Sequence, residues 1–170
     1  METFRTEVNG LHRNLRGELN IGLTDNLVTL PYMRITNALA QLKTLGPDVR
    51  INIRMISPSE VEQGVLGGSL HIGVVPQADG LSGLDYLPLY EERSLLYCAV
   101  GHPLFYARDE QLNDQRLNNQ NAIAPTFRLP AEIQAHYQTL NCTASASDRE
   151  GMAFLILTGL YIGYLPDHYA

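Results

Sequence analysis

The sequence predicts an α/β protein built from two lobes, and three observations favour this class. Strand-like and helix-like segments alternate across residues 19–75, which is typical of parallel strands joined by right-handed crossovers. A second, shorter alternation follows across residues 122–146. Near the end, a helix is followed by the apolar run Gly159–Pro166, an order found where a chain crosses back between two α/β lobes.

Residues 1–16 are predicted to form a helix that Gly17 ends. Apolar residues recur at spacings of four, three and four, at Phe4, Val8, Leu11 and Leu15. This spacing places them in one narrow stripe, while charged residues occupy the other faces. Such a stripe suits a coiled-coil seam or a helix lying on a neighbour, although a helix covering the core of its own domain would show it too.

The first lobe is predicted to contain three strands. Apolar residues alternate with polar or small ones in each of them, at residues 19–23, 49–55 and 70–75. Pro76 closes the third strand. Two helices separate these strands, so the strands are expected to pair in parallel.

The two helices of this lobe have recognisable starts and stops. The first follows the capping cluster Thr24-Asp25-Asn26, carries Pro31 in its first turn and ends at Gly46-Pro47. The second starts at Ser57-Pro58-Ser59-Glu60, where a hydroxyl, a proline and a reciprocal glutamate occupy their preferred places. Gly67-Gly68 ends it.

The second lobe is predicted to begin with two strands and then to repeat the α/β alternation. Its elements are strands at 84–89 and 94–100, a strand at 122–124, a helix at 130–140, a strand at 142–146, and a helix capped by the hydroxyl of Ser147. Gly101-His102-Pro103 breaks the second strand. Residues 109–121 are polar and match neither pattern.

The composition is that of an ordinary globular protein with an acidic balance. The 170 residues are 45% hydrophobic and 18% charged, with a net charge of −6. This charge argues against a nucleic-acid surface on this chain, because duplex binding needs clustered lysine and arginine. Cys98 and Cys142 lie far apart among apolar residues, so they are expected to be reduced core residues rather than a disulfide or a redox pair.

A membrane span or a secretory signal is not expected. No apolar run approaches the roughly 20 residues that a span requires. Glu2, Arg5 and Glu7 leave no signal sequence at the start. We therefore expect a cytoplasmic protein without a membrane partner, although an exported protein cut free of its signal would give the same pattern.

The sequence contains no pattern that indicates catalysis, a metal or a cofactor. Gly67-Gly68-Ser69 follows a helix and precedes a strand, which indicates a helix stop, whereas a phosphate loop has the opposite order. There is no Gly-x-Ser-x-Gly elbow and no Cys-x-x-Cys pair, and the five histidines lack metal-ligand spacing. His102 is expected to be a turn residue, with a catalytic base as the less favoured alternative.

Three polar clusters stand where a predicted strand passes into a helix. They are Thr24-Asp25-Asn26, Ser57-Pro58-Ser59 and Ser147-Asp148. In open α/β sheets, ligands bind beyond the carboxyl ends of the strands, where helix N-termini present free amides. Each hydroxyl could instead only cap its own helix. Convergence of all three clusters on one cleft would favour a ligand site.

Taken in order, these motifs resemble the effector-binding domain of LysR-type transcriptional regulators. The opening Gly17-x-Leu19-x-Ile21-Gly22 resembles the strand after the linker helix of that family. Gly68-x-Leu70-His71-Ile72-Gly73-Val74 is similar to a Gly-x-Leu-Asp-hydrophobic run, and residues 84–104 look like the crossing into the second lobe. Ser147 and residues 159–166 resemble the return crossing. The resemblance covers residues 17–170.

The resemblance implies a periplasmic-binding-protein-like fold of two Rossmann-like lobes joined by a double crossover. By position, it implies residues 1–16 as the end of the linker helix, 17–89 and 161–170 as the first lobe, and 90–160 as the second. The C-terminal part of the first lobe is expected to be missing, because the family continues beyond a point matching Ala170. Chain crossings are expected near Tyr90 and Tyr161.

The resemblance also implies a small-molecule effector in the cleft between the lobes. Carried over by position, the residues expected to line the cleft are Thr24, Asp25, Asn26, Ser57, Ser59, Pro76, Thr126 and Ser147. The family forms homo-oligomers, as dimers or tetramers, and it contacts DNA through an N-terminal winged helix-turn-helix that this chain lacks.

Two residues depart from the family pattern. His71 stands where an aspartate is usual; a core or capping role is favoured, with pH sensing as the alternative. Tyr161 stands where glycine is common, and its ring could narrow the cleft, alter the crossing or pack against a lobe.

The sequence thus favours a regulatory domain that senses a small polar metabolite, with an anion as one option, and does no chemistry on it. A solute-binding protein of a transport system would share the fold, and only the helical stripe at residues 4–15 favours the regulator. A small α/β enzyme would need a nucleophile or base with an orienting partner, and the sequence indicates none.

Overall fold

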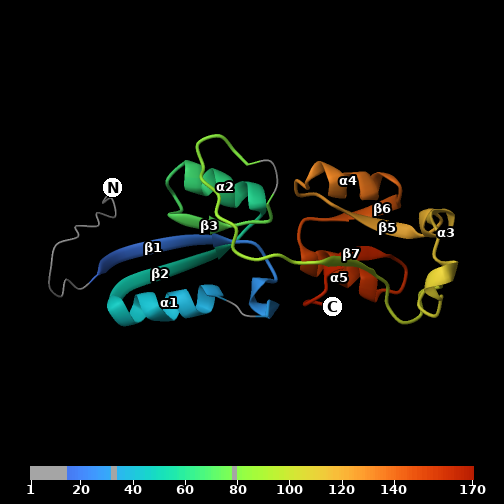
Figure 1. The fold of residues 1–170 in the computed structure, drawn as a ribbon, viewed down its shortest axis with the longest axis horizontal. Helices are drawn as coiled ribbons and strands as arrows, with labels where there is room; N and C mark the ends of the chain where they lie inside the picture. Colours follow the sequence, from blue (N-terminus) through green and yellow to red (C-terminus); the bar gives the residue numbers. More distant parts are fainter. Residues whose placement is uncertain (1–14, 32–33, 78–79) are drawn as a thin grey trace.

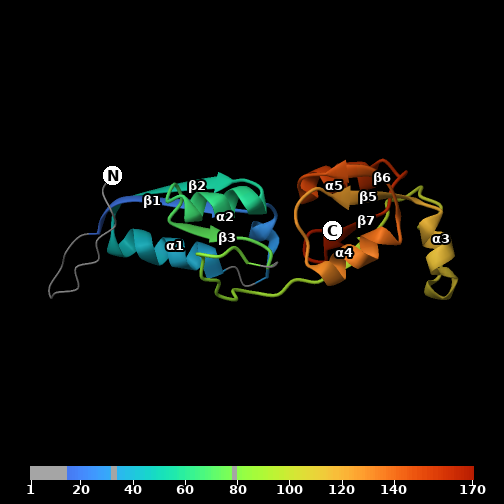
Figure 2. The same cartoon turned by 90° about the horizontal axis from the view of Figure 1, so that it is seen from above.

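The computed structural model describes residues 15–31, 34–77 and 80–170, and it has two α/β lobes arranged along the long axis of the molecule (Figure 1). Figures 1 and 2 show one segment of the chain crossing from the first lobe to the second, while the C-terminal residues stay beside α5 and β7 of the second lobe. The predicted fold class is confirmed. Of the predicted N-terminal helix, residues 1–14 lie outside the described part of the chain.

The first lobe contains a parallel sheet with a helix on each face (Figure 1). Its strands are β1 (Arg16–Leu23), β2 (Asp48–Met55) and β3 (Ile72–Val74), in the order β2-β1-β3. The helices are η1 (Leu27–Thr29), α1 (Arg34–Leu45) and α2 (Pro58–Leu66). Ile21, Leu23 and Leu27 form the core of this lobe, and partly buried residues of α1 pack against them.

Local sequence determines the start, the end and the close packing of α2. Ser57 caps the helix, and Glu60 completes a capping box with it, as predicted. Gly67 ends α2, and Gly68 has a φ of 74°, a left-handed conformation that favours glycine. A Cβ atom on Gly73 of β3 would lie 2.3 Å from Cγ1 of Val61, so only glycine lets this strand approach α2 so closely.

The second lobe contains four strands. They are β4 (Ser94–Tyr97), β5 (Asn121–Pro125), β6 (Asn141–Ala146) and β7 (Gly163–Pro166). β5 and β6 pair in parallel, and β4 and β7 pair in antiparallel. A bridge between Ala122 and Ile162 joins the two pairs, which gives the order β6-β5-β7-β4.

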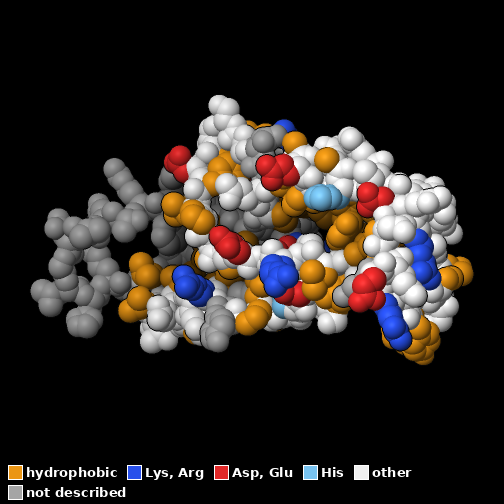
Figure 3. Space-filling model, turned by 45° about the vertical axis from the view of Figure 1, so that its right-hand side comes forward, with side chains coloured by type: hydrophobic (Ala, Val, Ile, Leu, Met, Phe, Trp, Pro, Cys, Tyr) orange, Lys and Arg blue, Asp and Glu red, His pale blue; other side chains and the backbone are white. Residues whose placement is uncertain are grey.

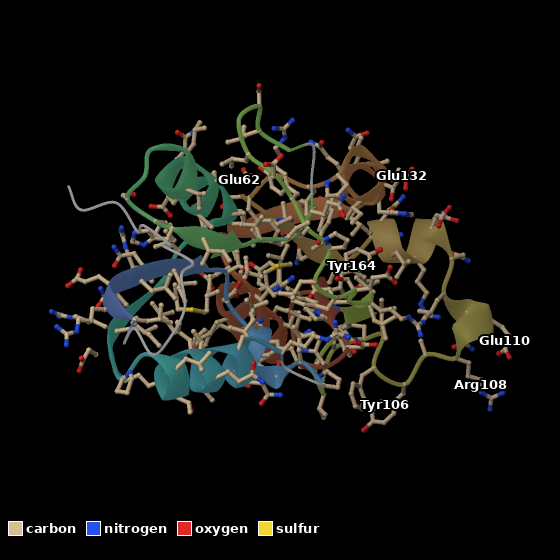
Figure 4. All side chains as sticks on the ribbon, turned by 60° about the vertical axis from the view of Figure 1, so that its left-hand side comes forward. Glu62, Tyr106, Arg108, Glu110, Glu132 and Tyr164 are labelled. Atoms are coloured by element: carbon tan, nitrogen blue, oxygen red, sulfur yellow. The ribbon has the colours of Figure 1, made fainter. Side chains whose placement is uncertain are left out.

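Helices and a compact apolar core complete this lobe. The helices are η2 (Asp109–Gln111), α3 (Asp114–Asn118), α4 (Ala131–Gln138) and α5 (Arg149–Leu157). Ile123, Met152, Ile156 and Leu165 form the main core cluster. In Figure 4, Tyr106, Arg108 and Glu110 project from the outer end of this lobe, whereas Tyr164 lies within it and stacks edge-on against Tyr137 of α4.

The strand predicted at residues 84–89 is wrong. This segment has no sheet partner and runs in extended form from the first lobe toward the second. Its residues are mostly exposed, and Pro88 lacks the amide that pairing would use. The apolar side chains that suggest a strand therefore belong to a crossing segment.

Other boundaries also differ from the prediction. Gly17 lies inside β1 and does not end a helix, because β1 already begins at Arg16. β7 pairs with β4, so residues 163–166 belong to the second lobe, whereas the resemblance implies 161–170 in the first. The polar stretch 109–121 forms η2, α3 and the start of β5.

The two cysteines differ in their surroundings. Both are free thiols, and Cys98 packs beside the buried cluster that contains Leu104 and Ile162. Cys142 is exposed, so its predicted core position is wrong. It is the second residue of β6, which is an edge strand paired only with β5, and this position leaves the side chain open to solvent.

The two other residues singled out in the sequence have structural roles. His102 is buried at the turn after β4, where its Nδ1 accepts a hydrogen bond from the Leu104 amide over 3.1 Å. Burial lowers the pKa of His102. Tyr161 is half-buried and packs against the core cluster around Ile123. Of the three roles considered for its ring, the structure shows packing against a lobe.

His71 holds the first-lobe sheet together at the start of β3. The Asn20 amide donates to His71 Nδ1 over 2.9 Å, and the His71 amide donates to Asn20 O over 2.8 Å. The side chain is exposed, so the core alternative is wrong. An aspartate here could accept the same hydrogen bond.

We expect His71→Leu to lower the free energy of unfolding by about 1 kcal/mol, because the Asn20 amide loses its acceptor. His71→Asp should stay closer to the wild type, since a carboxylate still accepts from that amide. Urea denaturation of the three proteins measures the difference. Equal losses in both variants would show that the Nδ1 contact is not what matters.

Among the residues that the structure describes, no helix is long and apolar enough to span a membrane.

Candidate ligand site between the lobes

The carboxyl ends of β1, β2 and β3 meet at the edge of the first lobe that faces the second (Figure 1). The Thr24 amide donates to Val74 O over 3.2 Å, and the Ile56 amide donates to Leu23 O over 3.1 Å. Thr24, Ser57 and Pro76 therefore follow three neighbouring strand ends, as predicted.

The parallel strands of the second lobe end at the edge that faces the first lobe (Figures 1 and 2). The Thr126 amide donates to Ala146 O over 2.9 Å, which continues the β5–β6 pairing beyond the strands. Thr126 thus lies beside the residue that precedes Ser147. The strand ends of both lobes point toward one another.

A direct hydrogen bond joins the two edges. The Arg149 amide, in the first turn of α5, donates to Asp25 Oδ2 over 2.6 Å. The Arg149 guanidinium also donates from Nη1 to the Asp25 carbonyl over 3.2 Å. The residue after Thr24 in the first lobe therefore contacts the residue after Asp148 in the second.

Two polar atoms at the end of β1 are buried without a hydrogen-bond partner. They are Thr24 Oγ1 and Asn26 Nδ2. Asn26 has a φ of 64° and precedes η1, but its side chain does not cap that helix. A buried polar group without a partner costs about 1–3 kcal/mol, so a ligand group that bonds to these atoms would recover that cost.

The three predicted serines are engaged with neighbouring side chains. Ser57 Oγ donates to Glu60 Oε2 over 2.6 Å and lies 3.3 Å from Ser59 Oγ. Ser147 Oγ donates to Asp148 Oδ2 over 3.0 Å. The predicted cap at Ser147 is wrong, because Asp148 caps α5 by accepting from the Gly151 amide over 2.7 Å.

Carboxylates already occupy the helix N-termini at this site. Asp25 and Asp148 accept amides in the first turn of α5, and Glu60 Oε2 accepts the Ser57 amide at α2 over 3.0 Å. The hydrogen bonds from the Ser57 side chain and then its backbone lower the pKa of Glu60. An anionic ligand would have to compete with these carboxylates for the amides.

Four residues at this site were not predicted from the sequence. Glu92 in the first crossing accepts from Arg149 Nη2 and lies 3.4 Å from His168 Nε2. His168 Nδ1 in turn lies 2.8 Å from Thr29 Oγ1. These four residues are far apart in the sequence, and nothing in their local patterns predicts that they meet.

Tyr90 lies beside this group of charges. Burial raises its pKa to about 12, with a further contribution from the negative charge of Glu92, which Arg149 opposes. Tyr90 therefore stays a neutral phenol at any ordinary pH. Tyr90 also lines a cavity beside the start of the first crossing.

Two cavities lie near this region. One, of about 320 Å³, is lined by Leu30, Pro31, Arg34, Ile35, Leu89, Tyr90 and Glu91. The other, of about 300 Å³, lies in the second lobe between β5 and α4, with Phe127, Tyr137 and Cys142 in its wall. None of the eight predicted cleft residues lines either of these two cavities.

A family model described as the LysR substrate binding domain matches residues 12–170. The chain belongs to this family. The resemblance noted in the sequence is thereby confirmed, and so is the fold that it implied.

A curated relative of this LysR substrate-binding chain is the HTH-type transcriptional activator BauR of Pseudomonas aeruginosa. The two are 62% identical over 170 residues, which is 100% of this chain and 56% of BauR. The chain thus spans about half the length of the curated relative that it matches.

Solved structures of LysR family members share the fold. HinK of Pseudomonas aeruginosa is 19% identical with a TM-score of 0.67, over 91% of this chain and 53% of HinK. The effector binding domain of BenM, with its effector benzoate, is 17% identical with a TM-score of 0.60, over 89% of this chain and 70% of that one. The relatives are transcriptional regulators, which does not favour the solute-binding alternative.

Acidic and basic side chains are interspersed on the face of the molecule seen in Figure 3, with exposed hydrophobic groups between them. This face has no continuous positively charged surface of the kind that binds a nucleic-acid duplex.

Proposed function

We propose that this chain is the effector-binding part of a LysR-type transcriptional regulator and that a small polar metabolite binds between its lobes. The observation that carries the proposal is the pair of unpartnered buried atoms, Thr24 Oγ1 and Asn26 Nδ2, at the carboxyl end of β1. A ligand with an acceptor for the Asn26 amide and a polar group for the Thr24 hydroxyl would satisfy both. The ligand is bound and not chemically changed.

In the proposed site, the eight residues predicted from the sequence surround the ligand from both lobes. Support comes from their position on the two facing strand edges and from the Asp25–Arg149 hydrogen bond between those edges. Binding would favour one arrangement of the lobes over another and so change the geometry of an oligomer. The oligomer would act in the cytoplasm and contact DNA through a winged helix-turn-helix outside this chain.

Calorimetric titration with a panel of small polar metabolites tests the proposal. With a ligand in hand, we expect Thr24→Val to weaken binding by about 3- to 10-fold, because one hydrogen bond is lost without a change of shape. Thr44→Val is the matched control: Thr44 lies on α1, where its hydroxyl donates to Ala40 O over 2.9 Å. Equal affinity in the wild type and Thr24→Val would remove Thr24 from the site.

We further propose that the outer face of α5 takes part in the homo-oligomer. Phe154 (69%) and Leu157 (74%) on α5 are mostly exposed, and so are Leu160 (66%) just after the helix and Val100 (72%) in the turn after β4. An exposed apolar patch of this kind is typical of a surface that another protein covers.

We expect Leu157→Asp to shift the protein toward monomer in sedimentation velocity runs, because a charge would be buried at the contact. Leu87→Asp is the control, since Leu87 is 90% exposed in the first crossing. An unchanged oligomer in Leu157→Asp would exclude this face.

A further inference from the structure

Two hydrogen bonds join one residue of the first lobe to one residue of the second. Arg149 of α5 donates from its backbone amide to the Asp25 carboxylate over 2.6 Å and from its guanidinium to the Asp25 carbonyl over 3.2 Å. Arg149 is only 8% exposed, so water competes little for these bonds. Thr29 Oγ1 and His168 Nδ1, 2.8 Å apart, also join the lobes. Asp25 therefore takes part in two of these three contacts.

The first turn of α5 depends on the other lobe for one acceptor. Arg149 is the first residue of this helix, and the amide of a first helical residue has no acceptor within its own helix. The Asp25 carboxylate supplies that acceptor from the first lobe. By contrast, the Gly151 amide donates to Asp148 of its own lobe over 2.7 Å. The Arg149 amide is therefore satisfied in this way only while the lobes are together.

Glu92 holds the Arg149 guanidinium in the direction that this contact needs. Arg149 Nη2 donates to the Glu92 carboxylate, and Nη1 is left for the Asp25 carbonyl. The side chains of Arg149 and Glu92 are 10% and 20% exposed, so this ion pair is largely buried. Glu92 is therefore a positioning residue, and Asp25 meets a donor that is already oriented.

The closed contact buries the atoms of the proposed ligand site. Thr24 Oγ1 and Asn26 Nδ2 belong to the residues on either side of Asp25, and both atoms are buried without a partner. Neither residue lines the two cavities described above. A ligand group can bond to these atoms only if the segment around Asp25 moves away from α5. That movement breaks both hydrogen bonds to Arg149.

We propose that the contact between Asp25 and Arg149 is a latch that holds the lobes shut over the ligand site, and that the latch and a bound ligand exclude one another. The second half of this proposal rests on the proposed function. A ligand that binds only the open form has its apparent affinity reduced by the fraction of the protein that is open. Its binding then favours an arrangement of the lobes different from the latched one.

Hydrogen exchange of single amides, followed by NMR on the ligand-free chain, tests the hydrogen bond of the latch. In the wild type, we expect the Arg149 amide to be protected from exchange, because it donates to Asp25. In Asp25→Ala, its exchange should become at least about 10-fold faster, which corresponds to the loss of about one hydrogen bond. The Gly151 amide should keep its rate, since its acceptor lies in the same lobe.

Asp25→Asn and Asp85→Ala complete this experiment. Asp25→Asn keeps an acceptor without the charge, so the Arg149 amide should exchange at a rate between those of the wild type and Asp25→Ala. Asp85→Ala removes the same charge from an exposed position of the first crossing and should leave the rate unchanged. A wild-type Arg149 amide that exchanges like an unprotected one would exclude the latch. An equal acceleration at Gly151 in Asp25→Ala would mean that α5 itself frays, and the latch would then be wrong.

The distance between the lobes is a second readout, one that a local loss of a hydrogen bond would not move. Spin labels can be placed on the exposed Cys142 of the second lobe and on Thr44→Cys of α1, with Cys98 replaced by alanine. Pulsed electron paramagnetic resonance on labelled chain diluted with unlabelled chain then measures the distance within one molecule. We expect Asp25→Ala to broaden the distances and shift them to longer values, and Asp85→Ala to leave them unchanged. Identical distances in the wild type and Asp25→Ala would show that Asp25 does not hold the lobes shut.

The latch and the proposed function can fail separately. With a metabolite found by calorimetry, we expect saturation of the wild type to speed exchange of the Arg149 amide and to lengthen the distance between the labels. A bound ligand that leaves the Arg149 amide as protected as before would overturn the exclusion, while the binding function would stand. If no metabolite binds but Asp25→Ala opens the lobes, the latch stands and the proposed function falls.

Discussion

Arg149→Met is expected to destabilise the domain by about 3–5 kcal/mol, because it leaves the largely buried Glu92 carboxylate without its main cation. The wild-type guanidinium bonds to Glu92 and also to the Asp25 carbonyl in the other lobe. Methionine keeps most of the apolar stem, so the loss reports on the charge and its hydrogen bonds and not on packing. Urea denaturation followed by circular dichroism measures the change.

Arg50→Met is the matched control for this experiment. Arg50 also pairs with a carboxylate, Glu18, at 3.7 Å, but both side chains are more than half exposed. An exposed pair contributes about 0–1 kcal/mol, so this variant should lie close to the wild type. A loss in Arg149→Met no larger than that in Arg50→Met would mean that the inter-lobe contact does not stabilise the domain. Adding Glu92→Gln to Arg149→Met should recover part of the loss, because it removes the stranded charge.

Ile123→Ala is expected to cost about 2–5 kcal/mol, since it opens a cavity in the middle of the second lobe. Ile123 lies in β5 with no exposed surface and packs in one cluster with Met152, Ile156 and Leu165. A Cβ on Gly163 would lie 3.1 Å from its Cδ1 atom, so β7 already packs closely against this side chain.

The matched control is Ile133→Ala on α4, where the side chain is 45% exposed. The same three carbons are removed there, but much of their surface already meets water, so the loss should be well under half that of Ile123→Ala. Thermal or urea unfolding of both variants gives the comparison. Similar losses in the two would place the core of this lobe elsewhere.

Much of the fold could be predicted from local pattern because its signals are local. The capping box at Ser57 and Glu60 satisfies amides within one turn, so its residue types alone indicate a helix start. The alternation in residues 49–55 predicts β2 because period two is a property of the strand itself. The failures occur where a local pattern has two outcomes, as at residues 84–89, whose apolar side chains suit a strand but find no partner.

The candidate site could likewise be predicted only in part from the sequence. Thr24, Ser57, Thr126 and Ser147 could be selected because parallel strands end at one edge, so a polar residue after a strand has a predictable place. Which of these atoms are free could not be predicted. Ser57 and Ser147 donate to nearby carboxylates, and only Thr24 and Asn26 among the described residues keep buried side-chain atoms without partners.

By itself, the sequence determined most of the helices and strands and the two-lobed class, and the resemblance of its motifs indicated the family. The helices and strands follow from spacing, capping and turn residues, which act over a few neighbouring positions. Only the tertiary structure decided that Asp25 meets Arg149 across 124 positions and that Glu92 lies between Arg149 and His168. Such contacts depend on how the two lobes pack against each other, and the free energy of a charged pair depends on its burial, which no single segment of sequence specifies.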